Sequence, residues 1–405
     1  MSDKRAANLA ILVAALGYFV DIYDLILFSV VRVRSLVAIG VPEDQLLDAG
    51  VRLLNLQMFG MLVGGILWGV LGDRRGRLSV LFGSILLYSL ANLANAMVTS
   101  VEMYGALRFI AGIGLAGELG AGITLVAELM HRQSRGYGTT LVASVGILGA
   151  IAAELVAESF DWRVAYVVGG VLGLALLVLR VSVRESHLFQ QVKTTGVARG
   201  DFLALITDRG RLVRYLAVIM VAVPIWYVIG ILVTFAPEFA KAMSLPYAPS
   251  AGRSILWLYA GLVVGDLASG LLSQWIRSRR KAIALFLALT VVGCAAYFLR
   301  LAPTLAGFYA LCVGMGFTIG YWAVFITMAA EQFGTNLRAT ATTTAPNFVR
   351  GAVVPMTWAF QTFRDGAGLG VVGGGVAVGV IVLGLAVFAL VGLDETFGKD
   401  LDYVE

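Results

Sequence analysis

The stretch GVLGDRRGR (residues 69–77) joins two long apolar segments, near residues 51–72 and 78–98. Each segment has about 20 residues, the length that an α-helix needs to cross about 30 Å of hydrocarbon. Glycine lets the backbone turn sharply, and charged side chains are costly inside a bilayer, so the turn should lie in water. The stretch therefore predicts a tight, charged loop between two membrane-spanning helices.

The composition extends this prediction to the whole chain. Of the 405 residues, 59% are hydrophobic and only 14% are charged, whereas a soluble domain has about 25% charged residues. A β-barrel would instead show alternating segments of about 10 residues. We predict an all-α integral membrane protein with twelve transmembrane helices, near residues 9–38, 51–72, 78–98, 101–130, 136–158, 163–182, 211–240, 252–276, 282–300, 304–331, 339–364 and 369–393.

The two halves of the chain repeat the same signals in the same order. GLLSQWIRSRRK (residues 270–281) follows the eighth span as GVLGDRRGR follows the second, and the fourth and tenth spans each end in a glutamate and an arginine seven residues apart. We predict two pseudo-symmetric six-helix bundles, at residues 1–182 and 211–405, with a cytoplasmic linker at 183–210. Repeated bundles are typical of secondary transporters, which bind their substrate between the halves near the bilayer midplane.

The basic residues indicate the orientation. Most of the 30 lysines and arginines lie in loops on the side of the two termini, which predicts that both termini are cytoplasmic. These loops also account for the net charge of +5, so we expect no nucleic-acid partner. The two histidines lie in loops, and no cofactor or metal is predicted. We expect a monomer in the lipid bilayer of a bacterial inner membrane.

The charged loop after the second span resembles the loop signature of the major facilitator superfamily, and the resemblance covers essentially the whole chain. The glutamate–arginine pairs and the RES and DETFGKDL endings of the halves resemble the sugar porters and metabolite:proton symporters of that superfamily. Met61 and Leu62 stand where those symporters usually carry Arg-Pro. On the cytoplasmic face, such charges can latch one state of a transporter. The candidate gating residues are Gly69, Asp73, Arg74, Gly76, Arg77, Glu128, Arg135, Glu331 and Arg338.

Two aspartates interrupt the apolar first span, in GYFVDIYDLILF (residues 17–28). Asp24 lies at nearly the same depth as Arg108 of the fourth span. An aspartate that pairs with arginine when ionised and releases it when protonated is a proton-coupled switch. The sugar porters use such a pair, and Tyr23-Asp24 with Arg108 resembles it. The alternative is a static ion pair.

Asp21 and Glu118 are further candidates for proton coupling. Asp21 lies one turn before Asp24, so it either competes with Asp24 for a proton or lines a solvated cavity. Glu118 lies among glycines of the fourth span, where it faces another helix or a cavity. It either takes a proton, pairs with an arginine, or makes a hydrogen bond in the helix packing.

Arg350 is the main candidate for substrate binding. It lies twelve residues after Arg338, about 18 Å into the eleventh span, and its planar guanidinium fits a carboxylate with two hydrogen bonds. The segment RATATTTAPNFVRGAVVP (residues 338–355) resembles organic anion transporters, and the resemblance implies that Arg350 binds an anion. Asp266 has a similar depth and either neutralises Arg350 in the empty site or pairs with it permanently. The residues that complete the candidate substrate site are Tyr23, Gln57, Trp226, Tyr227, Tyr321, Trp322 and Asn347.

These features favour proton-coupled symport of a small organic anion, a carboxylate. Proton-driven efflux of organic cations or drugs and proton-coupled sugar uptake remain as alternatives. The fifth span, VGILGAIAAE (residues 145–154), lacks the proline typical of proton antiporters. A membrane enzyme or a sensor is a further alternative, but the spans hold no Ser-His pair and the cytoplasmic segments are too short for a signalling domain.

Overall fold

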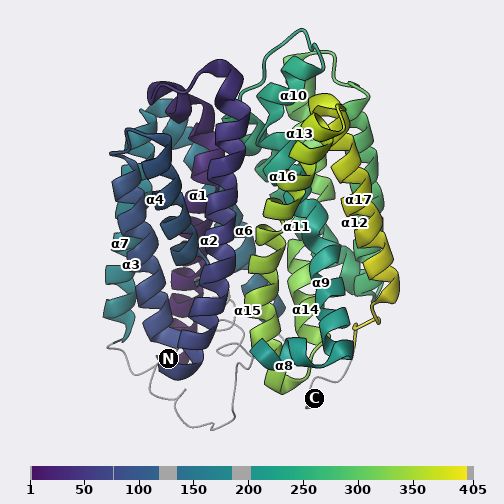
Figure 1. Ribbon diagram of the computed structural model, residues 1–405. Helices are drawn as coiled ribbons and strands as arrows, with labels where there is room; N and C mark the ends of the chain where they lie inside the picture. The colour runs from purple at the N-terminus through teal and green to yellow at the C-terminus, as the bar shows by residue number, and fades with distance from the viewer. Residues whose placement is uncertain (1, 76, 118–134, 185–201, 399–405) are drawn as a thin grey trace.

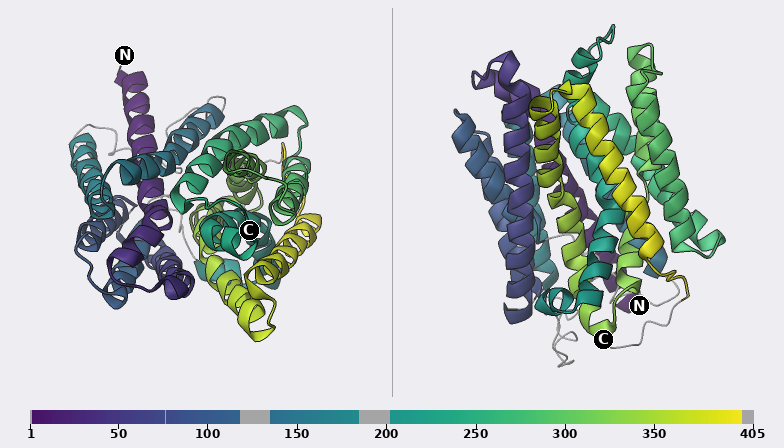
Figure 2. Two further views of the ribbon diagram at one scale, coloured as in Figure 1. Left: turned by 90° about the horizontal axis from the view of Figure 1, so that it is seen from above. Right: turned by 45° about the vertical axis from the view of Figure 1, so that its right-hand side comes forward.

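The computed structural model describes residues 2–75, 77–117, 135–184 and 202–398, and within these ranges the chain is helical with no strand. Long helices stand side by side in two groups (Figure 1). Viewed along the helices, the purple and blue first half lies beside the teal to yellow second half (Figure 2). We refer to these groups as the N-terminal half and the C-terminal half.

Apolar runs close to the predicted spans form the helices of the N-terminal half. Short polar connections separate them, and Ser100 begins one helix by accepting a hydrogen bond from the Met103 N–H at 3.2 Å, as an N-cap residue does. The helices are α1 (Ser2–Ala38), α2 (Leu46–Arg75), α3 (Arg77–Asn95), α4 (Val101–Leu115), α6 (Arg135–Ser159) and α7 (Trp162–Arg184), with a 3₁₀ turn at Glu43–Gln45.

The C-terminal half begins with a short helix and contains more interruptions. Its helices are α8 (Phe202–Thr207), α9 (Arg209–Tyr227), α10 (Ala236–Ala242), α11 (Ala251–Trp275), α12 (Arg279–Phe298), α13 (Leu305–Thr318), α14 (Trp322–Glu331), α15 (Thr335–Gly351), α16 (Val353–Gln361) and α17 (Gly370–Gly392). Two π-helical segments, Val228–Val233 and Thr362–Gly366, follow α9 and α16.

The prediction of an all-α, multi-pass membrane fold is confirmed. In the described part of the chain, eight helical segments are long and apolar enough to cross a membrane. Three predicted spans are not single helices, because the segments near 211–240, 304–331 and 339–364 each divide into two helices. The boundaries predicted for the two bundles and the linker stay a prediction, since residues 185–201 are not described.

Glycines bring the second and fourth spans of each half into close contact. A Cβ atom at Gly112 of α4 would overlap the Gln57 carbonyl oxygen of α2, and one at Gly316 of α13 would overlap the Leu258 carbonyl oxygen of α11. The backbones of these pairs can meet only where a side chain is missing. The same glycine-mediated contact therefore occurs at equivalent places in the two halves.

The start of α1 and the end of α17 lie at the same end of the molecule (Figure 1). We name this the terminal end and the other the distal end. The connections between α1 and α2 and between α10 and α11 lie at the distal end.

Candidate functional site

Arg350 of α15 lies between the two halves and is 1% exposed. Its Nη2 atom is 3.8 Å from Asp21 Oδ2 of α1, so the two residues form an ion pair across the halves. Its Cζ atom lies 5.8 Å from the ring centroid of Trp322, at the start of α14. The structure thus brings together three of the predicted site residues: a cation, an acid and an aromatic ring.

The guanidinium of Arg350 retains unused donors. Its Nε and Nη1 atoms are buried and have no hydrogen-bond partner among the residues that the structure describes. A buried charge is stable only when its donors are satisfied. The parallel N–H pairs of a guanidinium are Nε with Nη2 and Nη1 with Nη2, so a carboxylate can bind Arg350 in two bonds through Nη2 together with one of the unused donors.

Two predicted amide residues present acceptors. The amide nitrogen of Gln57 donates to the Leu25 carbonyl oxygen at 2.9 Å, and that of Asn347 donates to the Ala116 carbonyl oxygen at 3.0 Å. Only the NH₂ group of an amide can donate to a carbonyl, so these bonds fix the orientation of both side chains. Within the described ranges, the Gln57 Oε1 and Asn347 Oδ1 atoms have no hydrogen-bond partner.

Asp266 lies in a different position from the one expected of an Arg350 partner. Its Oδ1 atom accepts a hydrogen bond from the Ala323 N–H at 2.8 Å, where α14 begins after the interruption at Gly320. Free N–H groups at a helix start favour a carboxylate. Asp266 thus stabilises the broken tenth span, and Asp21 is the acid that pairs with Arg350.

Three predicted tyrosines donate to backbone carbonyls inside their own half. The acceptors are the carbonyl oxygens of Ala165 for Tyr23, at 2.9 Å, of Gly375 for Tyr227, at 2.7 Å, and of Val221 for Tyr321, at 3.0 Å. These hydroxyls hold helices together. Trp226, next to Tyr227, is also buried. A role for these four side chains in substrate binding stays a prediction.

Asp24 and Arg108 are both fully buried in the N-terminal half. Arg108 donates from Nη2 to Asn92 Oδ1 at 2.7 Å and from Nε to Asn95 Oδ1 at 3.3 Å, and its Cζ lies 4.8 Å from the Tyr166 ring centroid. The Asp24 carboxylate packs on α7 at Gly169, where a Cβ atom would overlap its Oδ1. Both charges act on Tyr166, one turn before Gly169. Their predicted coupling role stays a prediction.

The two aspartates of α1 have different neighbours, although only three residues separate them. Asp21 faces Arg350 of the C-terminal half, whereas Asp24 faces α7 of its own half. The two carboxylates therefore belong to different sites, Asp21 to one between the halves and Asp24 to one within the N-terminal half. This geometry favours separate roles over competition for one proton.

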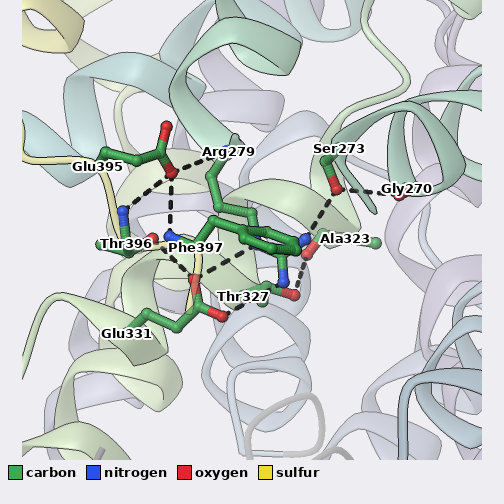
Figure 3. A network of polar contacts seen from close by, with 9 residues as sticks. All are labelled: Gly270, Ser273, Arg279, Ala323, Thr327, Glu331, Glu395, Thr396 and Phe397. Carbon is green, nitrogen blue, oxygen red and sulfur yellow. Dashed lines mark hydrogen bonds and ion pairs between the residues drawn. The ribbon is translucent and has the colours of Figure 1, made fainter. Parts of the chain in front are cut away.

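Several predicted gating residues fall outside what the structure describes. Glu118, Glu128 and Gly76 are not described, and for a further set only the backbone is described: Gly69, Asp73, Arg74, Arg77 and Arg135. In the C-terminal half, Arg338 donates from Nε to the Ala330 carbonyl oxygen at 2.9 Å. Glu331 lies 3.3 Å from Arg279 Nη2 and accepts from the Thr396 hydroxyl at 2.7 Å (Figure 3).

Glu395 extends this network past the end of α17. It accepts from the Ser278 hydroxyl. It also accepts from the backbone N–H of Arg279 at 2.9 Å, where α12 begins (Figure 3). Burial alone would raise the pKa of Glu395, but hydrogen bonds from Ser278 and from the N–H groups of Phe397, Arg279 and Thr396 outweigh it and lower the pKa. Arg279 and Glu395 were not among the residues predicted from the sequence, although both lie in segments that the two halves repeat.

Other polar contacts join the two halves at the distal end. Arg32 of α1 is buried and lies 2.6 Å from Glu238 of α10, and it donates to the Thr234 carbonyl oxygen at 3.1 Å. Arg364 binds Asp48 at 2.7 Å, and Arg253 pairs with Glu158. These residues were not predicted from the sequence. A charged residue in an apolar span, Arg32, could have indicated this contact between the halves.

The comparisons with known proteins agree on one family. The crystal structure of a D-xylose–proton symporter superposes with a TM-score of 0.73 and 18% identity, covering 97% of this chain and 99% of the other. A niacin transporter of Acinetobacter baylyi is 29% identical over 71% of this chain and 72% of its own length. A gentisate transporter of Corynebacterium glutamicum is 27% identical over 84% of this chain and 77% of its own. The profile of the Major Facilitator Superfamily matches residues 14–355. The chain therefore belongs to the Major Facilitator Superfamily of transporters and is not an enzyme.

Proposed function

We propose that this transporter carries a small organic acid across the membrane together with protons, by alternating access. The observation that carries the proposal is Arg350, a buried cation between the halves with unused donors in the described part of the chain. A carboxylate can take one of these donors together with an N–H of Nη2 in a bidentate arrangement. An organic cation would meet the positive charge of Arg350 beside Asp21, and a neutral sugar could not form hydrogen bonds between two charged groups with Arg350.

The surroundings of Arg350 suit an aromatic or other planar acid. Trp322 offers a ring face beside the guanidinium, and aromatic groups stack on such faces. Two relatives are named for niacin and gentisate, which are aromatic carboxylic acids. Small aromatic acids are thus the first substrates to test.

We assign the proton to Asp24, with Arg108 as its counter-charge and Glu118 as a second candidate. Asp24 and Arg108 are removed from water in one half, and a buried carboxylate near an arginine changes its interactions when it takes a proton. Inward symport also fits cytoplasmic termini, which the loop charges favour, and a bacterial inner membrane.

The substrate assignment can be tested in liposomes that contain the purified transporter. We expect uptake of labelled gentisate or niacin to rise when the outside is made acidic. Arg350→Ala removes two charge-assisted hydrogen bonds of about 1.5–3 kcal/mol each, so uptake at low substrate concentration should fall by about 100-fold or more. Arg350→Lys should restore little, because an ammonium lacks the planar fork. Arg52→Ala, at an exposed position of α2, is the matched control. Unchanged affinity in Arg350→Ala would refute the carboxylate site.

The proton assignment needs a second variant. Asp24→Asn cannot gain or lose a proton, so a pH gradient should no longer drive accumulation, while exchange of internal for external substrate continues. An Asp24→Asn protein that still concentrates substrate against its gradient would show that the proton binds elsewhere.

A further inference from the structure

The contacts of Arg108 differ from those of an ordinary buried arginine. Buried arginines are usually paired with carboxylates, because an uncompensated charge is costly inside a protein. The oxygens that accept from Arg108 belong to the amides of Asn92 and Asn95, at 2.7 and 3.3 Å, and its third contact is the face of Tyr166. Among the described residues, these three contacts are all uncharged groups.

We propose that Asn92, Asn95 and Tyr166 form an uncharged cradle that positions Arg108 while leaving its positive charge to act on Asp24. This inference rests on the proposed proton coupling through Asp24 and Arg108. A carboxylate in the cradle would neutralise Arg108 permanently. Amide oxygens and an aromatic face stabilise the cation only in part, so its charge still favours the ionised form of Asp24.

The third nitrogen of the Arg108 guanidinium supports this proposal. Its Nη1 atom is buried and has no hydrogen-bond partner among the described residues, while Nε and Nη2 are held by the two amides. An arginine anchored on one side of its guanidinium keeps a fixed direction for the other side. The cradle thereby determines where the Nη1 group of Arg108 lies.

Hydrogen bonds also hold the cradle in place. The amide nitrogen of Asn95 donates to the Ala91 carbonyl oxygen at 2.7 Å. The hydroxyl of Tyr166 lies 2.7 Å from that of Tyr104, which donates to Ser35 Oγ at 3.2 Å. The ring beneath Arg108 is thus connected to α1, the helix that carries Asp24.

In the described part of the chain, the titratable groups that interact with Arg108 or Tyr166 come from three helices, α1, α4 and α7. The groups of α2 that pack against Gly105 and Gly112 of α4 are uncharged. The side chains of Leu53 and Leu56 lie against Gly105, and the carbonyl oxygen of Gln57 lies against Gly112. Glu102, in the first turn of α4, is exposed. Among the described residues, the groups that interact with Arg108 or with its tyrosine contacts are Asp24 of α1, Tyr104 of α4, and Tyr166 and Arg163 of α7. Tyr23 of α1 lies beside Asp24, and Tyr88 of α3 lies against α7 at Gly173. Asp24 is the acid in this set.

Asn92 is the best position for a test, because its amide nitrogen has no hydrogen-bond partner among the residues described. Asn92→Asp therefore loses no described hydrogen bond, keeps the shape of the side chain and adds a negative charge 2.7 Å from Arg108 Nη2. The new ion pair should leave the melting temperature unchanged or raise it. Because Arg108 is then neutralised, Asp24 should hold its proton at higher pH.

The experiment measures initial uptake of labelled gentisate or niacin as a function of external pH, in liposomes. We expect Asn92→Asp to move the midpoint of the pH profile upward by about one pH unit or more, a tenfold change in proton affinity. Exchange of internal for external substrate should continue. Asn92→Ala removes the acceptor without adding charge, and should move the midpoint by much less.

Asn95→Asp provides a second test if Asn92→Asp does not fold. It places a carboxylate beside Arg108 Nε and loses the bond to Ala91, so it should be less stable but move the midpoint in the same direction. A folded Asn92→Asp or Asn95→Asp protein with the wild-type midpoint would overturn the proposal. If the wild-type protein itself shows no acid-stimulated uptake, the proposed function fails instead.

Discussion

At the scale of single residues, three fully buried arginines are stabilised in three different ways. Arg32 is held by a carboxylate and by the Phe235 ring at 4.5 Å. Arg108 is held by neutral amides and a tyrosine ring. Arg350 has an acid at 3.8 Å and two nitrogen atoms without a hydrogen-bond partner in the described part. A buried N–H group without an acceptor is costly. An arginine whose N–H groups have protein acceptors can close an interface, whereas one with N–H groups left over can bind a ligand.

Glu395 gives a prediction at this scale. Its carboxylate caps the start of α12, and its pKa lies below the ordinary value of 4.5. A group with a lowered pKa stabilises the folded state above its unfolded-state pKa, and this contribution is lost as the pH falls through the folded-state pKa. Glu395→Gln should destabilise the protein by about 0.5–1 kcal/mol at pH 7, because Glu395 is exposed and water screens part of the interaction. The difference in melting temperature from the wild type should shrink below pH 4.5.

The control for this prediction is the neighbouring residue Asp394, which is exposed. Asp394→Asn should change the melting temperature little at any pH, because its described hydrogen bond uses the backbone oxygen and not the carboxylate. A difference for Glu395→Gln that stays constant from pH 7 to acid would mean that the charge of Glu395 is not what stabilises the cap.

At the scale of elements, interruptions and glycines decide how the helices pack. The tenth span breaks between α13 and α14, and Asp266 binds the free backbone of the break. The seventh span loses α-helical geometry at Val228, whereas Pro224 lies within α9. Proline removes one backbone N–H donor, but the helix changes from α to π geometry only at Val228, one turn after Pro224. Because glycine has no side chain, the glycines of α11 and α13 let the backbones of these two helices touch.

Two glycines of α13 provide a matched pair for a prediction. A Cβ atom at Gly316 would overlap the Leu258 carbonyl oxygen, whereas one at Gly314 would meet nothing within 4 Å. A carbonyl in a helix cannot move aside, so Gly316→Ala should lower the stability by about 1–3 kcal/mol. Gly314→Ala should leave it unchanged or raise it slightly, because alanine is the better helix former. Melting temperatures in detergent provide the measurement, and equal values for the two variants would contradict the close contact.

At the scale of the whole molecule, the polar contacts between the halves at the distal end connect Arg32 with Glu238, Asp48 with Arg364, and Glu158 with Arg253. These ion pairs hold the halves together at that end. A transporter that alternates between two states must break such contacts in each cycle, so their strength sets the ratio of the two populations.

The Arg32–Glu238 pair gives a prediction about this ratio. Glu238→Gln removes the charge that holds the buried Arg32, worth about 1.5–3 kcal/mol, so the population open at the distal end should rise roughly tenfold or more. Spin labels at two exposed positions, Asp44 in the N-terminal half and Lys241 in the C-terminal half, should report longer distances in this variant.

Asp365→Asn is the control for the distal-end prediction. Asp365 pairs with Arg364 of its own half at 2.6 Å, so the loss of its charge should leave the distance distribution between the labels nearly unchanged. A wild-type distribution in Glu238→Gln would show that the Arg32–Glu238 pair does not hold the distal end closed.

The sequence by itself determined the membrane class, the helical fold and the buried charges, because long apolar runs, repeated loop signals and isolated ionisable residues are local properties of the chain. It also identified Arg350, Asp21, Asp24 and Arg108 before any contact was known. The tertiary structure alone decided their partners: Asp21 rather than Asp266 lies at Arg350, and neutral amides surround Arg108. The physical reason is that a partner depends on the rotation and depth of two helices far apart in the chain, and a shift of one turn, about 5.4 Å, exchanges one partner for another.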